Sequence, residues 1–497
     1  MPRNIKKDQI KSSFMRFIIK NFGPIEKADV TLKNLNIFIG KNSSGKSYLA
    51  YLIWALLSVE PDWEKLIDLF NRFVPNSLIN SAISKFEALR KGFQEREKEF
   101  DLKRYVDELS KIDEELSNRF KSLIIEAYKK FDEIWGRNLE ELLKNAFLVD
   151  KVYKLVKAGY EEAEITVSND NGDKRIHIRI NKNGLTSWVD KAVLEDLKRN
   201  LFVSVISGKP MLVSLDYYGE NSKELTHSES FIKNTQAIGI VPASFMFVFD
   251  YYAPFSQTFI APDGRTGLIR SIEAYKYALI SRRVTINEVD RIFMRDFDAL
   301  YPKVKNEKIS SFANFIEERL GIKYILGREQ PRFTVQVKDV EIPLQRAPSG
   351  YRELAPIVYV MKYALNDGSI IFIEEPEAHL HPDAQVIITR ALAGLSQYCY
   401  VVITTHSITV LDEISNLLKL SKLPSDVKRN LGYEEWEGLN PENIGVFLFS
   451  DGKVEELKIY EDGIEESDLD RVVIEISNLH AMVEEEYEYS RRMQTQR

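Results

Sequence analysis

The sequence contains a single cysteine, and it lacks long apolar runs. Cys399 has no second cysteine with which to form a disulfide in the chain, and it stands in the apolar run YCYVVIT, which indicates a buried, inert thiol without a redox role. No stretch approaches the ~18 uninterrupted apolar residues that a membrane-spanning helix needs. The start, MPRNIKKDQIKSSF, also lacks the apolar core of a signal peptide. We therefore expect a cytoplasmic protein that makes no contact with membranes.

Positive charge is not in excess either, since the formal net charge at pH 7 is −7. This balance argues against a uniformly basic protein that coats nucleic acid, but a local basic groove would still fit within it, so DNA contact stays open. With 44% hydrophobic and 29% charged residues, the composition is typical of globular proteins. A chain of 497 residues exceeds what one hydrophobic core usually supports, so we expect more than one structural unit.

A glycine-rich loop between a predicted strand and a predicted helix carries the first chemical motif. Residues 40–47, GKNSSGKS, match the pattern G-x-x-x-x-G-K-[ST] in full. Short β-prone runs at 15–39 lead to the loop, and SYLAYLIWALLSV after it has the length and apolar repeats of a helix. In such a loop the backbone N–H groups wrap phosphates, Lys46 neutralises the β and γ oxygens, and the Ser47 hydroxyl ligates Mg²⁺. The motif predicts binding of ATP or GTP by Gly40, Lys41, Asn42, Ser43, Ser44, Gly45, Lys46 and Ser47.

The second motif is an apolar strand that ends in adjacent carboxylates, SIIFIEEPE at 369–377. A buried parallel strand places such residues at its carboxyl end, where an α/β sheet binds its ligand. One carboxylate can hold Mg²⁺ through water while the next polarises the attacking water. We therefore predict Glu374 as the residue on the metal side and Glu375 as the general base. An acidic surface turn is the alternative, but such a turn would not need the apolar run before it.

A third apolar strand, VVITTHS at 401–407, also ends in polar residues. A histidine at its tip, His406, could contact the γ-phosphate and respond to its presence. A lone histidine is more often structural, but this one follows Glu375 by 31 residues (406 minus 375), which favours the functional interpretation.

Together these segments resemble the ABC-class ATPases of the RecF, SMC and OLD-like type. The resemblance is carried by FIIKNFGPIEKADVTLKNLNIFIGKNSSGKS, by the signature-like PSGYREL, by the Walker B segment IIFIEEPEAHLHP and by the switch segment VVITTHS. It implies an α/β fold in which an ABC-type P-loop ATPase head carries inserted helical arms and a β-rich lobe. Residue by residue, it implies that Ser349 and Gly350 form the ABC signature, that 378–382 form the D-loop region and that His406 is the switch histidine.

A further segment, FIAPDGRTG at 259–267, resembles the PAxR-like element of the OLD-like group, with Arg265 at the basic position. The sequence departs from the general ABC pattern in two places. Its Walker B segment ends Glu-Glu instead of Asp-Glu, and its signature reads PSGYR where transporters have LSGGQ. Both departures favour a function other than transport. The glutamine of the Q-loop stays open between Gln236 and Gln257.

The signature also has a local physical interpretation. Ser349 and Gly350 open a helix predicted around 351–365, whose free N–H groups and positive dipole end form an anion site. In ABC ATPases this site faces the γ-phosphate held by the P-loop of the other subunit. The resemblance therefore implies a homodimer in which two chains share two composite Mg·ATP sites.

We expect six segments along the chain. A charged helical stretch after the P-loop helix is interpreted as a solvated hairpin, with DNA or partner contact as the alternative. Alternating patterns at 163–215 predict strands. The expected segments are the N-terminal half of the ATPase head with the P-loop (1–61), a helical insertion (62–148), a β-rich lobe with the PAxR-like segment (149–267), a second helical segment (268–325), the C-terminal half of the head (326–425), and C-terminal strands and a helix (426–497).

The resemblance favours an ATP-gated dimeric switch in DNA repair, or in defence against phages and plasmids, that works with a nuclease or another effector. The alternative is the nucleotide-binding subunit of a membrane transporter, although the helical insertions are long for such a subunit. A purely structural SMC-like tether would need far longer heptad helices.

We expect no nuclease activity from this chain alone. His379, His381 and His406 already belong to ATPase motifs, and His177, His227 and His480 are scattered along the sequence. The region after Asn443 is too short for the Toprim nuclease domain that many OLD-like proteins append. Its acidic residues are interpreted as a solvated helix start, namely Glu465, Glu466 and Asp468.

Overall fold

The structure is a computed structural model, and it describes residues 15–73, 114–169, 175–191, 201–206, 209–214, 257–272, 286–329, 332–460, 463–464 and 478–484. Several sequence predictions lie outside these residues. They concern most of the charged helical arm, the stretch 273–285, Gln236, His227, and the helix start at Glu465, Glu466 and Asp468. No helix in the described ranges is long and apolar enough to cross a membrane.

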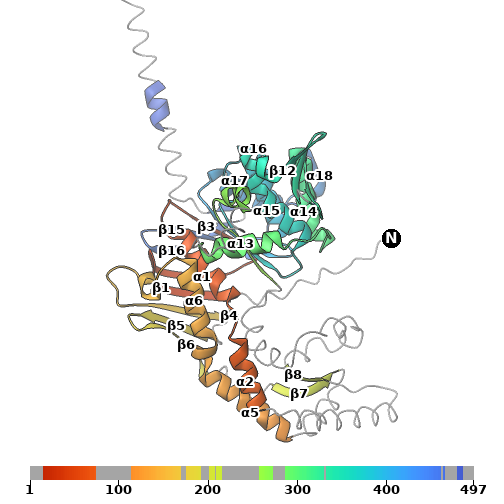
Figure 1. Ribbon diagram of the computed structural model, residues 1–497. Coiled ribbons are helices and arrows are strands. Elements are labelled where there is room, and N and C mark those ends of the chain that lie inside the picture. Colours follow the sequence, from red (N-terminus) through yellow and green to blue (C-terminus); the bar gives the residue numbers. More distant parts are fainter. Residues whose placement is uncertain are drawn as a thin grey trace, which may run out of the picture.

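One large sheet organises the described residues (Figure 1). It has 11 strands in the order β6-β5-β4-β1-β2-β16-β15-β3-β14-β13-β9. These strands are β1 (Met15–Phe22), β2 (Ile25–Thr31), β3 (Leu35–Gly40), β4 (Glu162–Asn169), β5 (Arg175–Asn181), β6 (Gly184–Val189), β9 (Thr258–Ala261), β13 (Ile370–Glu374), β14 (Tyr400–Thr405), β15 (Ile444–Ser450) and β16 (Lys453–Glu456).

The two halves of this sheet differ in strand direction and in burial. Neighbours from β15 through β3, β14 and β13 to β9 pair in parallel, and β3, β13 and β14 are buried at every residue. Parallel strands that are covered on both faces need such continuous apolar runs. From β2 to β6 the pairing is antiparallel, and β5 alternates between buried and more exposed residues. One face of the antiparallel half therefore faces solvent.

The predicted strands at 15–39 are confirmed as β1, β2 and β3. The strands within the β-rich lobe predicted at 149–267 lie at two places in the main sheet and in a smaller sheet. Strand β4 pairs with β1 and extends the main sheet through β5 and β6, while β9 pairs with β13 at the opposite edge. The backbone N–H and C=O groups along an open strand edge need partners, and β4 supplies them to β1.

Smaller sheets complete the strands. They are β7 (Leu201–Ile206) with β8 (Lys209–Ser214), β10 (Ile322–Leu326) with β11 (Phe333–Val337) and β12 (Val340–Pro343), and β17 (Ile459–Tyr460) with β18 (Gly463–Ile464).

Helices cover both faces of the main sheet. The α-helices are α1 (Lys46–Ser58), α2 (Trp63–Phe73), α5 (Glu114–Lys129), α6 (Arg137–Ala146), α11 (Arg265–Arg270), α13 (Glu288–Asp298), α14 (Glu307–Leu320), α15 (Ser349–Tyr363), α16 (Pro382–Leu395), α17 (Ile408–Leu420) and α18 (Ser425–Asn430). Short turns of other helix types are η1 (Asp132–Gly136), η2 (Val152–Leu155), η3 (Leu344–Arg346) and η4 (Pro441–Asn443). Helices α2 and α5 lie side by side and extend away from the sheet (Figure 1).

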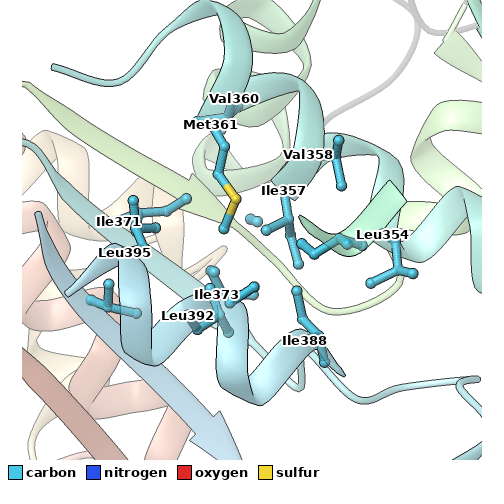
Figure 2. Close-up of a cluster of buried hydrophobic side chains, with 14 of the residues drawn as sticks. Leu354, Ile357, Val358, Val360, Met361, Ile371, Ile373, Ile388, Leu392 and Leu395 are labelled. Carbon is cyan, nitrogen blue, oxygen red and sulfur yellow. The ribbon is translucent and has the colours of Figure 1, made fainter. Parts of the chain in front are cut away.

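Alternate residues of β13 face two different cores. Ile370 and Phe372 belong to the core shared with α1 and α6, whereas Ile371 and Ile373 belong to the core shared with α14, α15, α16 and α17. This split follows from the period of two in a strand. Figure 2 shows the second core, where side chains of α15 and α16 surround Ile371 and Ile373. Since burying one Leu or Ile side chain contributes about 1.5–3 kcal/mol, this packing holds α15 firmly on β13.

Candidate nucleotide-binding and hydrolysis site

Five parallel strands end at one edge of the sheet, and four of them, β3, β14, β13 and β9, are followed by the segments that carry the candidate site. The P-loop follows β3, the carboxylates of Glu374 and Glu375 end β13, His406 follows β14, and Asp263 lies just beyond β9. In parallel α/β sheets, the carboxyl ends of the strands form the ligand-binding edge. The structure thus brings the P-loop, both predicted glutamates and His406 to one edge, although they are far apart in the sequence.

The P-loop has the backbone geometry of a phosphate cradle. Gly40 and Gly45 have φ values of 149° and 106°, which residues other than glycine rarely adopt. A Cβ atom on Gly40 would lie 2.5 Å from the carbonyl oxygen of Phe449, so the chain passes too close there for any other residue. Ser44 Oγ is buried and has no hydrogen-bond partner in the described part of the chain. Such an orphaned hydroxyl fits a loop that receives phosphate oxygens.

Lys46 is the first residue of α1, and its side chain folds back over the loop. Its Nζ atom donates to the carbonyl oxygens of Gly40 at 2.8 Å and Lys41 at 2.9 Å. Burial lowers the pKa of Lys46, and the negative charges of Glu375, Glu377 and Glu374 oppose that shift. The lysine therefore stands in the field of the carboxylates that follow β13.

Glu374 is buried, and one of its oxygens is held by two donors. Oε2 accepts a hydrogen bond from the hydroxyl of Tyr51 and another from the backbone N–H of Asp263, at 3.0 Å. Burial, and after it the charge of Glu374, raises the pKa of Tyr51 far above its usual value, so the hydroxyl stays protonated and donates. The other oxygen, Oε1, accepts no hydrogen bond from the described residues.

Asp290 on α13 adds another carboxyl group near Glu374. Burial, followed by the negative charge of Glu374, raises the pKa of Asp290 to about 6. The Nδ2 atom of Asn287 donates to its Oδ2 at 3.0 Å. Sequence reasoning did not find Tyr51, Asp263 or Asp290 as site residues. Tyr51 alone had a local signal, since it lies four residues after Ser47 and therefore on the same face of α1.

Glu375 has an unusual backbone conformation and faces His406. Its φ is 42°, in the left-handed region that costs a residue other than glycine about 1–3 kcal/mol. Its N–H donates to the carbonyl oxygen of Thr404 at 2.9 Å, which anchors the turn to β14. Its Oε1 lies 3.3 Å from Nδ1 of His406, and the two side chains are 29% and 47% exposed. The predicted base and the predicted switch histidine therefore stand side by side, open to solvent.

Glu377 connects the segments that follow β13 and β14. Its buried Oε1 accepts from the Thr405 hydroxyl and, at 3.4 Å, from the backbone N–H of His406. Its Oε2 is buried without a hydrogen-bond partner among the described residues. Although Glu377 stands within the predicted motif, its part in holding the His406 segment was not foreseen.

The signature residues begin α15, as the sequence predicts. Ser349 is exposed, and its carbonyl oxygen accepts from the hydroxyl of Thr266 at 3.5 Å. A Cβ atom on Gly350 would lie 3.2 Å from the carbonyl oxygen of His379, in the predicted D-loop region. The signature thus lies next to the PAxR-like segment and the D-loop region of its own chain.

Gln257 is excluded as the Q-loop residue by its position. Its carbonyl oxygen accepts from the N–H of Ile370 at 2.8 Å, at the start of both β9 and β13. Because strands rise about 3.3 Å per residue, the length of β9 separates Gln257 from the ligand edge. Gln236 lies outside the described residues. Asp263 is the side chain just after β9 at the ligand edge.

The donors near the P-loop suit one magnesium ion. Mg²⁺ prefers oxygen ligands and usually binds through one or two carboxylates, water and substrate phosphates. Ser47 is exposed on the first turn of α1, and Glu374 has one oxygen without a partner in the described chain. These two groups fit that donor set. In the described residues, no group of three or more His, Cys, Asp or Glu side chains could hold a metal ion.

The fold and the site together define an ABC-class P-loop ATPase. The family described as AAA ATPase domain matches residues 15–202 and 263–411, which is more than half of the chain. The chain therefore belongs to the AAA ATPase domain family, and it is an ATPase. The predicted class is thus confirmed. No curated protein matches the chain.

Solved structures of ATPase heads match with low scores. An SMC head bound to the C-terminal winged-helix domain of ScpA is 13% identical, with a TM-score of 0.38, and the match covers 90% of this chain and 97% of that one. The SMC head domain from Thermotoga maritima is 11% identical, with a TM-score of 0.32 and coverage of 90% and 100%. The recombination mediator RecF is 13% identical, with a TM-score of 0.28 and coverage of 90% and 99%. At these scores the likenesses carry no weight for function.

Proposed function

We propose that this chain is a Mg²⁺-dependent ATP hydrolase that works as a homodimeric, ATP-gated switch. The observation that carries the proposal is the approach of Glu375 to His406, at 3.3 Å, on the edge of the sheet that also holds the P-loop. A carboxylate and an imidazole beside a phosphate cradle can orient and deprotonate a water molecule. The fully matched P-loop pattern supports nucleotide as the substrate.

The residues of the P-loop hold the nucleotide in this proposal. Backbone N–H groups of residues 40–47 and the Ser44 hydroxyl surround the phosphates, and Lys46 turns from its own loop carbonyls to the phosphate oxygens. Ser47 and the free oxygen of Glu374 hold Mg²⁺. When bound, the ion neutralises charge on the β and γ phosphates.

Glu375 acts as the general base on the attacking water. Its backbone N–H is bonded to the Thr404 carbonyl and its carbonyl oxygen accepts from Nη2 of Arg265 at 3.0 Å, so both peptide groups next to the base are fixed. A positioned base needs such support, because small misplacements of a catalytic group cost much of its effect. His406 contacts the same water or the γ-phosphate.

The exposed start of α15 supports the homodimer in this proposal. The first N–H groups and the positive dipole end of this helix favour an anion, and Ser349, its first residue, is exposed. We propose that they bind the γ-phosphate held by a second copy, so that two chains share two composite sites. This step rests on the resemblance to ABC ATPases.

The cellular role also rests on that resemblance. We propose a switch in DNA repair, or in defence against phages and plasmids, in which a nuclease or another effector chain performs any cleavage and the helical arms contact a partner or DNA. We also propose a cytoplasmic location, and we retain the six-segment division with one change: the strands β4, β5, β6 and β9 of segment 149–267 belong to the main sheet of the head.

The hydrolysis of ATP by a Glu375→Gln variant tests the proposed chemistry. General-base catalysis contributes about 10²–10⁴-fold, so turnover should fall by at least ~10²-fold while ATP binding is retained. Glu455→Gln, an exposed carboxylate on β16, is the matched control and should hydrolyse ATP at the wild-type rate. If Glu375→Gln turns over ATP as fast as Glu455→Gln does, Glu375 is not the base.

A further inference from the structure

Arg265, at the start of α11, is a completely buried cation whose three guanidinium nitrogens all donate hydrogen bonds. Nη1 donates to the carbonyl oxygens of Pro262 at 3.1 Å and Glu374 at 2.5 Å, and Nη2 donates to that of Glu375 at 3.0 Å. Nε donates to the carbonyl oxygen of Glu353 at 3.1 Å. A buried guanidinium is tolerated only when its donors and its charge are compensated. Here four backbone carbonyls satisfy the donors.

The charge is compensated by Glu353, which lies one turn into α15 and is almost fully buried. Its Oε2 is 3.0 Å from Nε of Arg265, yet this oxygen accepts no hydrogen bond from the described residues. The Nε–H bond is directed at the Glu353 carbonyl instead, so the carboxylate acts mainly through its charge. Arg265 therefore binds α15 through both the backbone and the side chain of one residue.

Arg265 and Glu353 form a clamp that joins the start of α15 to the turn after β13. Both segments belong to the proposed nucleotide sites. Apolar packing already fixes the body of α15 on β13, through Leu354, Ile357 and Met361 against Ile371 and Ile373 (Figure 2). The clamp lies beyond this packing, between the first turn of α15 and the turn that follows β13.

The first turn of α15 is more weakly tied to its own helix than the rest. Pro356 lies inside α15 and has no N–H to donate to the carbonyl oxygen four residues earlier. The carbonyl oxygen that lacks this partner is that of Arg352. At the next residue, Glu353, the side chain of Arg265 contacts both the backbone and the carboxylate and so holds the first turn from outside the helix.

At the other end, the clamp holds the backbone of Glu375. This residue keeps a φ of 42° although that conformation is costly, and it persists only if its surroundings fix it. Thr404 binds its N–H and Arg265 its carbonyl oxygen. Without Arg265, the carbonyls of Glu374 and Glu375 would both lose a donor, and the base would be free to turn.

We propose that Arg265 is a positioning residue that, with Glu353, couples the signature helix to the general base within one chain. This inference rests on the proposed function. In the proposed dimer the start of α15 faces the partner's nucleotide, whereas Glu375 faces the nucleotide of its own P-loop. The clamp therefore transmits the engagement of one composite site to the base of the other.

The first experiment compares Arg265→Lys and Glu353→Gln with Arg390→Lys. Arg390 also donates to a buried carboxylate, that of Glu437, but on α16 away from the nucleotide edge, so it controls for the loss of a buried ion pair. We expect kcat to fall by ~10–10²-fold in the two clamp variants, with KM for ATP changed by less than ~3-fold, since the base is misplaced and the P-loop is untouched. Arg390→Lys should lower the thermal midpoint without changing kcat.

The second experiment asks whether the clamp acts within one chain. In mixed dimers, Glu353→Gln is placed either on the chain that carries Glu375→Gln or on the opposite chain. On the same chain, the surviving base keeps an intact clamp, and only the start of α15 that faces its nucleotide from the other subunit loses support, so hydrolysis should stay within ~3-fold of that of a dimer with Glu375→Gln in one chain alone. On the opposite chain, the surviving base loses its clamp, and hydrolysis should fall ~10-fold further.

The outcomes separate the inference from the proposed function. Equal hydrolysis by the two mixed dimers would overturn the proposed coupling by Arg265 and Glu353. The same holds if Arg265→Lys and Glu353→Gln both keep the kcat of Arg390→Lys. Neither result would contradict the role of Glu375 as the base. Unchanged hydrolysis by Glu375→Gln alone would overturn the proposed function instead. If Arg265→Lys does not fold, Glu353→Gln, which preserves side-chain shape, decides the question.

Discussion

Nδ1 of His406 lies 3.3 Å from Oε1 of Glu375, although the two residues directly follow different strands. The pairing of β13 with β14 brings them together, with Glu374 in register with Thr404. Glu377 then fixes the His406 segment from the side by accepting from the N–H of His406. The imidazole is therefore positioned by the sheet and by one buried carboxylate, and it shares the open edge with the proposed base.

The first prediction concerns His406. Because the side chain of His406 is partly exposed, His406→Ala should fold normally. The variant lacks the imidazole that lies beside Glu375 and that we propose to contact the attacking water or the γ-phosphate. We expect single-turnover hydrolysis to slow by ~10–10²-fold at saturating ATP, with ATP affinity changed much less. His480→Ala, which removes a highly exposed histidine, is the control. Equal rates for the two variants would remove His406 from the hydrolysis step.

The sequence predicts the parts of this site that lie in short continuous patterns. The P-loop, the two glutamates after β13 and His406 are each marked by an apolar strand followed by polar residues. Their meeting at one edge follows from parallel pairing. The start of α15 at Ser349 was also predictable, since the signature pattern places it there.

The missed residues reach the site through pairings that no local pattern encodes. Asp263 approaches Glu374 because β9 pairs with β13, and Asp290 does so because α13 packs near that edge. Arg265 was singled out by resemblance, but its complete burial between two elements depends on how α11 and α15 pack. Likewise, β4 pairs with β1 although more than 100 residues separate them in the sequence, so strands of the expected β-rich lobe extend the main sheet.

The second prediction tests composite sites by mixing two inactive variants. Lys46→Ala blocks the P-loop face of a subunit, and Ser349→Arg blocks its signature face. A mixed dimer of the two contains one intact site, so random exchange should restore about a quarter of wild-type hydrolysis. Steady phosphate release after subunit exchange measures this.

Two further mixtures control for the complementation experiment. Wild type mixed with the Lys46→Ala, Ser349→Arg double variant forms mixed dimers without an intact site and should show no gain. Wild type mixed with Lys46→Ala reveals whether one site alone can turn over. If one intact site can hydrolyse ATP, but the mixture of Lys46→Ala and Ser349→Arg stays inactive, the shared-site dimer loses its support.

The third prediction concerns Tyr51, whose hydroxyl donates to Glu374. Removing a residue that hydrogen-bonds to a metal-binding carboxylate typically lowers metal affinity or activity by about 10–100-fold. We expect Tyr51→Phe to raise the Mg²⁺ concentration for half-maximal hydrolysis by about 10-fold, and to weaken Mn²⁺ binding to the ATP complex measured by paramagnetic resonance. Tyr48→Phe, on the exposed side of the same helix, should change neither. The same Mg²⁺ dependence in both variants would contradict the role of Tyr51.

The fourth prediction uses the single cysteine as a probe of the core. Cys399 is buried, its Sγ–H donates to the carbonyl oxygen of Asn366 at 3.5 Å, and burial raises the pKa of the thiol to about 12. Because the thiolate is the reactive form, alkylation by iodoacetamide at neutral pH should be negligible in the folded protein and rapid in denaturant. Mass spectrometry counts the modified fraction. Rapid alkylation of the native chain would contradict the buried position.

The last prediction is a dependence of stability on pH that comes from Asp290. Burial, followed by the charge of Glu374, raises its pKa from 3.8 to about 6 in the folded protein. A raised pKa means that the folded state binds the proton more tightly than the unfolded chain does. The protonated Asp290 therefore contributes to the free energy of unfolding. This contribution is fully present below about pH 4 and is lost as the pH rises through about 6.

Above that range the charged carboxylate destabilises the fold, and an amide in its place would not. We therefore expect Asp290→Asn to be more stable than wild type at about pH 7.5, by about 1–2 kcal/mol after discounting for partial exposure. The gain should vanish near pH 4. Denaturant unfolding without nucleotide and with a chelator measures it, with Asp68→Asn on the exposed side of α2 as the control. A gain that is equal at both pH values would show that the charge of Asp290 is not its source.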